Sequence, residues 1–300
     1  MSFYNIREEM GLALNDILNR VCFNNKEYSK NNIAITWINY KGEKNHLGKG
    51  FGFGINNKKL IYPASIVKLV YGLATYSWIK TRKILLCDEI SDALYKMLFY
   101  SSNDATSFLV DILTGTSSGP CLEDDSWENW KYQRFIINDW LKDLNWDELH
   151  GINCCQKTWE DGPFGREKEF YGIDNTNRNM MTTDATARIM EEIMINIDYQ
   201  KEDFNLRNCL KRNLQKKFLN NDPLNQVMGF LGEGLPENVD FWSKAGLMSQ
   251  ARHDAAWWEN NNSVKTLLVV FGNGEQYFKD INLLPAIAKA VNKYNNDYFI

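Results

Sequence analysis

The apolar positions at the start of the chain recur at helical spacing. Residues 1–23, MSFYNIREEMGLALNDILNRVCF, predict an amphipathic helix. Two apolar runs of strand character follow, NIAITWINY at 32–40 and GKGFGFGIN at 48–56. The polar stretch KGEKNH between them predicts the turn of an antiparallel hairpin.

The middle of the chain changes to helical periodicity. It predicts helices over 63–80, 89–114 and 127–146, the last flanked by tryptophans. Residues 151–179 lack a period and are rich in Gly, Asn and charge, which predicts a long ordered loop of the kind that often carries function. TTDATARIMEEIMINI at 182–197 predicts a further helix with Thr183 or Asp184 as its cap.

Strand patterns return near the C-terminus. VDFWSKAGLM, HDAAWWEN and VKTLLVVFGNG predict three strands, and residues 278–294 predict a closing amphipathic helix. We therefore expect an α/β protein of the α+β type, with one antiparallel sheet built from both chain ends, flanking terminal helices and a helical lobe. The predicted single domain spans 1–300, with a sheet lobe of 1–62 plus 236–300 and a helical lobe of 63–235.

Composition narrows the possible partners and cofactors. The net charge is -4 and comes without long blocks of one sign, so we expect neither nucleic acid nor a membrane surface as a partner. The charged residues Arg7, Glu8 and Glu9 interrupt any leader-like apolar run, which favours a cytoplasmic location. The six cysteines contain no C-x-x-C, which favours reduced thiols over a disulfide framework or a metal site.

The stretch IYPASIVKLVYG, residues 61–72, places Ser65 and Lys68 three positions apart on one helical face. Burial among apolar neighbours lowers the pKa of an amine and makes a neutral base for a serine nucleophile. Pro63 suits a first helical turn, which leaves backbone N–H groups for an oxyanion. The alternative is a capping serine with a lysine that reaches solvent. Ser77 and Lys80 repeat the spacing later in the same helix without the proline, and we regard them as a chance pair.

Two further motifs accompany the first. YSSNDAT at 100–106 contains S-x-N, and WSKAGL at 242–247 contains the only K-x-G of the chain. With P-A-S-x-x-K these motifs resemble the serine β-lactamase and penicillin-binding-protein superfamily, and class A β-lactamases most of all. The resemblance covers about residues 30–298 and includes the predicted strands at both ends around a helical lobe.

The resemblance implies a role for each matching residue. Ser65 would be the acylated nucleophile and Lys68 its base or base partner, while Ser101 would pass a proton to the leaving nitrogen. Asn103 would hold the substrate amide, and Lys244, at the head of the motif that continues through Ala245 and Gly246, would supply positive potential near the substrate carboxylate. The N–H groups of Ser65 and Leu247 would form the oxyanion hole.

The implied activity is hydrolysis of a small β-lactam, amide or ester, with no cofactor and no metal. The oligomeric state stays open.

Several positions depart from the family pattern. Ala245 stands where the family usually has Thr or Ser, so a hydroxyl for a substrate carboxylate is missing, and Arg252 is a candidate to compensate. Ser102 replaces the usual Asp, and Ser101 follows Ser65 by a shorter interval than expected. For the deacylating carboxylate, Glu160 matches the local context TWEDGP, whereas Glu167 fits the distance to Thr182 better and Glu169 lies close behind.

The same residues also have ordinary structural interpretations. Ser101 and Asn103 are suited to helix capping, Lys244 to a solvated strand position, and the acidic loop residues to the surface. His253 and Asp254 do not form a Ser-His-Asp triad, because neighbours on a strand point to opposite faces. Two alternatives to a hydrolase stay open, a non-catalytic ligand-binding protein with this fold and a penicillin-binding-protein-like acyltransferase that deacylates slowly.

Overall fold

The computed structural model describes residues 2–23, 28–42, 46–196, 205–219, 222, 225–260 and 264–298. Within them one mixed sheet runs in the order β1 (Asn5–Ile6), β3 (Phe51–Ile55), β2 (Ile33–Lys41), β7 (Val264–Asn273), β6 (Ala251–Glu259), β5 (Asp240–Met248), β4 (Lys211–Arg212). Strand β1 is parallel to β3, and the other pairs are antiparallel. Strands from both chain ends therefore share one sheet, as predicted.

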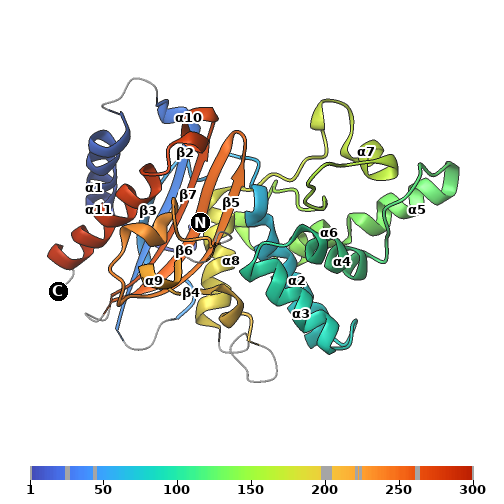
Figure 1. The fold of residues 1–300 in the computed structure, drawn as a ribbon, viewed down its shortest axis with the longest axis horizontal. Helices are drawn as coiled ribbons and strands as arrows, with labels where there is room; N and C mark the ends of the chain where they lie inside the picture. Colours follow the sequence, from blue (N-terminus) through green and yellow to red (C-terminus); the bar gives the residue numbers. More distant parts are fainter. Residues whose placement is uncertain are drawn as a thin grey trace.

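Helices cover both faces of this sheet, which explains why its central strands are buried along almost their whole length (Figure 1). In β2, Ile35 and Trp37 pack on one face against α1 (Glu8–Leu18) and α11 (Leu283–Tyr298). Ala34 and Ile38 pack on the other face, which we call the lobe face, against α2 (Lys68–Lys80) and α8 (Thr183–Ile195). Alternation along one strand thus feeds two separate cores.

The remaining helices extend the lobe face or link the sheet strands. The lobe contains η3 (Ala64–Val67), α3 (Asp88–Phe99), α4 (Asn103–Thr114), α5 (Asp124–Arg134), α6 (Ile136–Asp143), η4 (Asp147–Leu149), α7 (Gly165–Tyr171) and η5 (Ile173–Asn175). Elsewhere lie η1 (Asn19–Phe23), η2 (Lys30–Asn32), η7 (Asn208–Leu210), α9 (Lys216–Leu219), η8 (Leu231–Gly234) and α10 (Glu275–Lys279). Figure 1 shows α5 and α7 at the end of the lobe farthest from the sheet.

The predicted helix over 89–114 is wrong in one respect that matters for the site. It is two helices, α3 and α4, separated at residues 100–102. Ser101 has φ of +63°, a left-handed conformation that no helix continues through, and Ser102 then caps α4 by accepting a hydrogen bond from the N–H of Ala105 at 3.1 Å. The break turns Ser101 out of the helix and leaves its side chain and carbonyl available to other groups.

Other boundaries also shift. The predicted helix over 127–146 is α5 and α6, which meet at Phe135, and the long loop contains α7. The cap of α8 is Thr182, whose hydroxyl accepts from the N–H of Ala185 at 2.9 Å, and not Thr183 or Asp184. The closing helix is α10 followed by α11. The hairpin of β2 and β3 is confirmed, although residues 43–45 of its turn lie outside the described residues.

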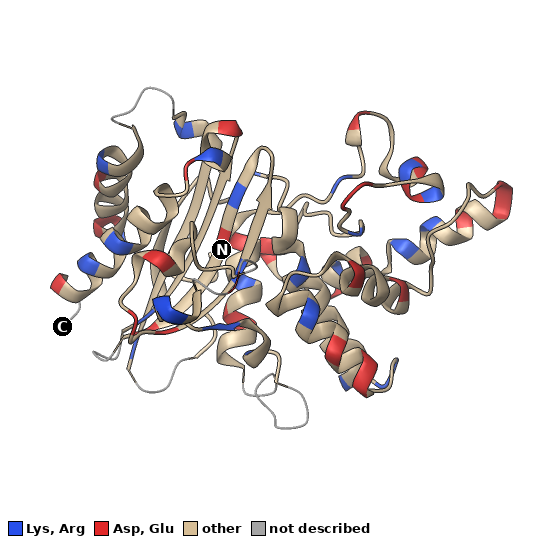
Figure 2. Cartoon of the chain, in the orientation of Figure 1, with Lys and Arg blue, Asp and Glu red and all other residues tan. Residues whose placement is uncertain are grey.

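All six cysteines are free, as expected of reduced thiols. Within the described ranges, no helix is long and apolar enough to cross a membrane, and no group of His, Cys, Asp and Glu is arranged to hold a metal ion. Lys and Arg are interspersed with Asp and Glu over both lobes, in agreement with the mixed charge of the sequence (Figure 2).

Candidate active site

Ser65 lies in the short helix η3, which begins immediately after Pro63 and leads into α2. This segment packs closely on β5. A side chain at Gly246 would approach the carbonyl oxygen of Pro63 to 2.8 Å, so the close contact requires glycine. The Ser65 side chain is partly exposed. The sequence thus brings the two motifs, P-A-S-x-x-K and K-x-G, into direct contact across the lobe boundary.

The Lys68 side chain is fully buried, so it is not a lysine that reaches solvent. Its amine donates to the carbonyl oxygen of Ser101 at 2.5 Å, to the Ser101 hydroxyl at 3.2 Å and to Oδ1 of Asn103 at 2.8 Å. Burial lowers the pKa of this amine to about 7, and the charge of Glu160 acts in the opposite direction. Among the hydrogen bonds of the described chain, none joins Lys68 to Ser65.

Lys244 approaches Ser101 from the opposite side. Its side chain on β5 is also fully buried, which contradicts a solvated strand position. Its amine lies 2.9 Å from the Ser101 hydroxyl, 2.6 Å from Oε1 of Gln226 and 2.8 Å from the carbonyl of Ala245. Burial holds the pKa of Lys244 well below its usual range, with a further contribution from the charge of Lys68. One hydroxyl therefore lies between two buried amines.

Asn103 connects this pair to the long loop. While its Oδ1 accepts from Lys68, its Nδ2 donates to Oε1 of Glu160 at 3.0 Å. Glu160 is exposed and follows Trp159 in the loop. Of the three loop glutamates, Glu160 is the one whose carboxylate reaches the constellation of Lys68, Ser101 and Asn103.

Beyond its short pairing with β4, the outer edge of β5 supplies backbone donors. The N–H of Ala245 donates to Gln226 at 3.1 Å, and the carbonyl of Ser243 accepts from Arg212 at 3.1 Å, so both residues point away from β6. Because the direction of the backbone polar groups alternates along an antiparallel strand, the N–H of Leu247 points the same way. The N–H of Leu247 therefore lies on the edge of β5 that η3 packs against.

Two residues of the site, Gln226 and Arg212, do not belong to any of the three sequence motifs. Gln226 bridges Lys244, the N–H of Ala245 and the carbonyl of Phe99, to which its Nε2 donates at 2.6 Å. Arg212 is buried and donates to the carbonyls of Leu98, Phe99 and Ser243. Burial lowers the pKa of Arg212 to about 10. Both residues come from the segment between α8 and β5, where the sequence has no clear period.

Arg252 does not belong to the site, so its suggested compensation for Ala245 is wrong. It pairs with Leu247 across β5 and β6, and its guanidinium donates to the carbonyls of Phe278 and Gly229 at 2.8 and 3.0 Å. These partners lie with α10 and the segment before η8, on the face opposite the lobe face.

Glu167 is also directed elsewhere. It is fully buried, accepts from Arg134 at 2.6 Å and from Ser118 at 2.8 Å, and lies 3.6 Å from Lys157. Glu169 is exposed on the same helix, α7. The spacing to Thr182 that favoured Glu167 was misleading because α7 shortens the path of the loop.

The expectation that His253 and Asp254 do not form a triad is confirmed. His253 Nε2 lies 3.0 Å from the carbonyl of Tyr62 on the lobe face, whereas Asp254 accepts from the N–H of Leu231 at 3.0 Å on the other face. Burial lowers the pKa of His253 to about 4 and raises that of Asp254 to about 7.

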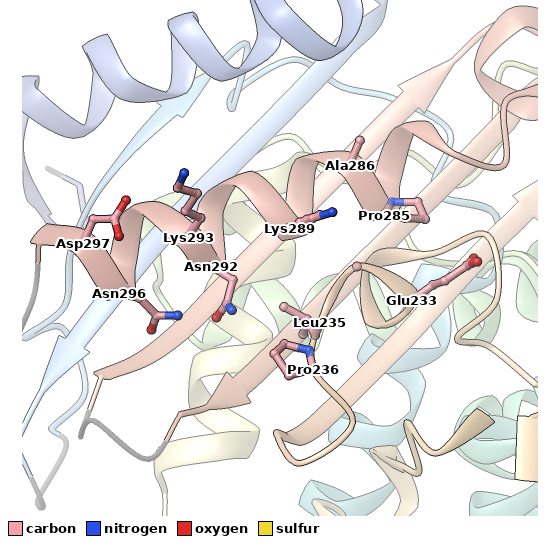
Figure 3. A pocket seen from close by; sticks show the side chains of 11 residues that line it. Glu233, Leu235, Pro236, Pro285, Ala286, Lys289, Asn292, Lys293, Asn296 and Asp297 are labelled. Atoms are coloured by element: carbon pink, nitrogen blue, oxygen red, sulfur yellow. The ribbon is translucent and has the colours of Figure 1, made fainter. Parts of the chain in front are cut away.

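The cleft of Figure 3 is separate from this site. It has a volume of about 570 Å³ and lies between η8 and α11, where Glu233, Lys289 and Asn292 line it. These elements cover the face opposite the lobe face. The candidate site residues all come from other segments.

The chain was compared with protein families, curated sequences and solved structures. A family model described as "Beta-lactamase enzyme family" matches residues 88–295. No curated protein sequence matches the chain.

Solved structures match over nearly the whole length. A β-lactamase from Chitinophaga pinensis has a TM-score of 0.66 at 12% identity, with 96% of this chain and 99% of that chain covered. The TLA-3 extended-spectrum β-lactamase has a TM-score of 0.66 at 14% identity, covering 95% and 98%. The protein PBP-A has a TM-score of 0.57 at 12% identity, covering 95% and 96%. At such identities the likeness shows the fold, which is that of β-lactamases and transpeptidases.

Proposed function

Because this chain belongs to the beta-lactamase enzyme family, we propose that it is a serine hydrolase that forms an acyl-enzyme at Ser65 with a small β-lactam, amide or ester. The observation that carries the proposal is the position of the Ser101 hydroxyl between the buried amines of Lys68 and Lys244, at 3.2 and 2.9 Å. Among the ion pairs of the described residues none involves either amine, and buried amines whose pKa is lowered by burial are more typical of groups that exchange protons than of structural ion pairs.

In the acylation step, the Ser65 hydroxyl attacks the substrate carbonyl carbon and its proton passes to Lys68, which follows one helical turn later. A pKa of about 7 leaves much of the Lys68 amine neutral at neutral pH and able to accept that proton. The N–H groups of Ser65 and Leu247 stabilise the oxyanion. When the carbonyl re-forms, the bond to the leaving atom breaks and Ser101 donates its proton to that atom, while Lys68 passes the proton it took from Ser65 to Ser101.

Deacylation requires a base for water. Glu160 is the proposed base because its carboxylate contacts Asn103 at 3.0 Å, and Asn103 in turn contacts Lys68. Water attacks the ester carbonyl as Glu160 accepts its proton. The bond to Ser65 Oγ then breaks, and the proton held by Glu160 passes to Ser65 Oγ, which restores the hydroxyl and the carboxylate. The acid product and the free enzyme result.

The first experiment is intact-protein mass spectrometry after incubation with a penicillin and, separately, with a fluorophosphonate. We expect a mass gain equal to the added acyl or phosphonyl group in the wild type and none in Ser65→Ala. The matched control is Ser77→Ala, which removes the serine of the second S-x-x-K on the same helix and should leave labelling unchanged. Absence of any adduct on folded wild-type protein would contradict the hydrolase proposal and favour a non-catalytic binding protein.

Glu160→Gln tests the deacylation step separately. We expect acylation to proceed and the adduct to persist, with its decay slowed about 10²- to 10⁴-fold, the usual contribution of a general base. Glu169→Gln, an exposed glutamate on α7, should decay as the wild type does. Unchanged decay in Glu160→Gln would exclude Glu160 as the base, and a persistent wild-type adduct would indicate a slow acyltransferase.

A further inference from the structure

The amine of Lys244 has no hydrogen-bonding capacity left for a substrate. As an ammonium it has three N–H donors, and three oxygens receive them, on Ser101, Gln226 and the backbone of Ala245. As a neutral amine it donates to Gln226 and Ala245 and accepts from the Ser101 hydroxyl. In either protonation state, groups of the protein use all of its hydrogen-bonding capacity.

Two other cations that contact the site, Lys68 and Arg212, are similarly occupied. The three contacts of Lys68 are with Ser101 and Asn103. The guanidinium of Arg212 donates to backbone carbonyls only, among the hydrogen bonds of the described residues, and Arg252 lies on the opposite face of the sheet. A carboxylate bound here would lack the charged donor that offsets its desolvation.

Gln226 occupies the place where such an anion would bind. Its Oε1 accepts from Lys244 at 2.6 Å and also from the N–H of Ala245 at 3.1 Å, so one carboxamide oxygen meets the two donors that would meet a carboxylate. Its Nε2 is held by the carbonyl of Phe99 at 2.6 Å, which fixes the orientation of the amide. The missing hydroxyl of Ala245 removes a further donor.

On the side away from Lys244, Gln226 faces a cavity lined by both apolar and charged side chains. Gln226 lines a cavity of about 280 Å³ whose walls include Phe99, Phe218, Leu219 and Val227. The charged side chains at its edge are Arg212, which is bonded to the backbone, and Asp222. Ser65, Lys68, Ser101 and Lys244 do not line this cavity, so it lies behind Gln226 and adds no free cation to the site.

From this arrangement we infer that the enzyme acts on substrates without a carboxylate beside the reacting bond, namely uncharged amides or esters, and that Gln226 determines this preference. The inference rests on the proposed function for its chemical step, but the binding preference itself does not require acylation. It replaces the expectation that Lys244 faces a substrate carboxylate.

The test compares benzylpenicillin with its methyl ester, which share the reacting ring and differ in the carboxylate. Acylation rates are measured by intact mass in the wild type, and dissociation constants by calorimetry in Ser65→Ala, which cannot be acylated. We expect the ester to acylate faster and bind tighter, each by tenfold or more. Faster acylation or tighter binding of the free acid would overturn the inference.

Substitutions at Gln226 supply the second arm. Gln226→Ala frees a donor of Lys244 and the N–H of Ala245, so the preference for the ester should shrink about tenfold. Gln226→Glu keeps the shape and adds a negative charge, so it should reject the acid more strongly than the wild type. Gln215→Ala, an exposed glutamine of the same segment, is the control and should leave the ratio unchanged.

An unchanged ratio in both Gln226 variants would exclude Gln226 as the determinant. If Ser65 forms no adduct while the ester still binds tighter to Ser65→Ala, the proposed function fails and the inference on binding stands.

Discussion

Two clusters of buried cations lie in the helical lobe and at its boundary, and they are built differently. In the site cluster, Lys68 and Lys244 contact neutral oxygens of Ser101, Asn103 and Gln226. In the second cluster, which holds the long loop to α4 and α5, Arg134 and Lys157 contact carboxylates: Arg134 lies 2.6 Å from Glu167, and Lys157 lies 2.8 Å from Asp111.

The difference separates a stabilising arrangement from a reactive one. A buried cation with a carboxylate partner keeps its charge, and removing one partner leaves the other uncompensated. A buried amine with only neutral acceptors loses its proton more easily, as the lowered pKa of Lys68 shows. In the proposed mechanism, the burial of the site amines lowers the stability of the protein and favours proton transfer, whereas the ion pairs of the second cluster hold the loop against α4 and α5.

The largest expected effect concerns Lys68 itself. Lys68→Ala should slow acylation of Ser65 by about 10²- to 10⁴-fold, because the nucleophile loses its base. Lys80→Ala, the lysine of the second S-x-x-K pair, should acylate at the wild-type rate. The measurement is the adduct mass against time. Equal rates for Lys68→Ala and the wild type would mean that Lys68 belongs with the structural cations.

Substitution in the second cluster should lower the stability of the protein. Glu167→Gln leaves Arg134 and Lys157 with Asp111 alone, so the free energy of unfolding should fall by about 3 kcal/mol. Glu169→Gln, exposed on the same helix, should change it by less than about 0.5 kcal/mol. Urea denaturation of both variants gives the comparison. A stability of Glu167→Gln equal to that of the control would show that the cluster is not stabilising.

Substitution of Lys68 in the site cluster should instead increase the free energy of unfolding. Lys68→Met removes an amine whose burial costs desolvation free energy. The free energy of unfolding at pH 7 should therefore rise by about 0.5–2 kcal/mol, as is common at functional positions. The same urea titration measures it. A loss of stability as large as that of Glu167→Gln would remove the distinction between the clusters.

The pH dependence follows from the same pKa. Between about pH 7 and pH 10, Lys68 is protonated in the unfolded chain but not in the folded one. The unfolded state binds more protons in that range, so the stability contributed by this group rises with pH and is lost again as pH falls towards 7. Urea denaturation at several pH values should show a smaller rise in Lys68→Met than in the wild type. An identical rise in both would contradict the lowered pKa.

The smallest expected effect is a shift in the pH midpoint of the acylation rate. The acylation rate should increase with pH around a midpoint near 7, as Lys68 becomes neutral. Glu160→Gln removes the negative charge that raises the pKa of Lys68, so the midpoint should move to lower pH by a fraction of a unit, since Glu160 is exposed and screened. A midpoint that moves upward would contradict the contact between the loop and the site.

Much of the fold could be predicted from the chain alone. The apolar run of β2 and the strand patterns of β5, β6 and β7 identify strands of a sheet that is buried on both faces. The helical periods of α1 and α8 identify their amphipathic faces. The break at Ser101 could not be read, because the helical pattern on either side is continuous and a left-handed serine has no compositional signal.

By itself, the sequence determined the residue types and local spacing of the three motifs, because S-x-x-K, S-x-N and K-x-G each lie within one turn or one strand. Only the tertiary structure decided which distant groups complete the site. Arg252 and Lys244 are separated by the sheet because the register of β5 and β6 assigns them to opposite faces, and a shift of one residue would reverse that. Glu160 contacts the site through Asn103, whereas Glu167 pairs with Arg134. Gln226 contacts Lys244. These contacts join residues far apart in the sequence, and no local pattern encodes them.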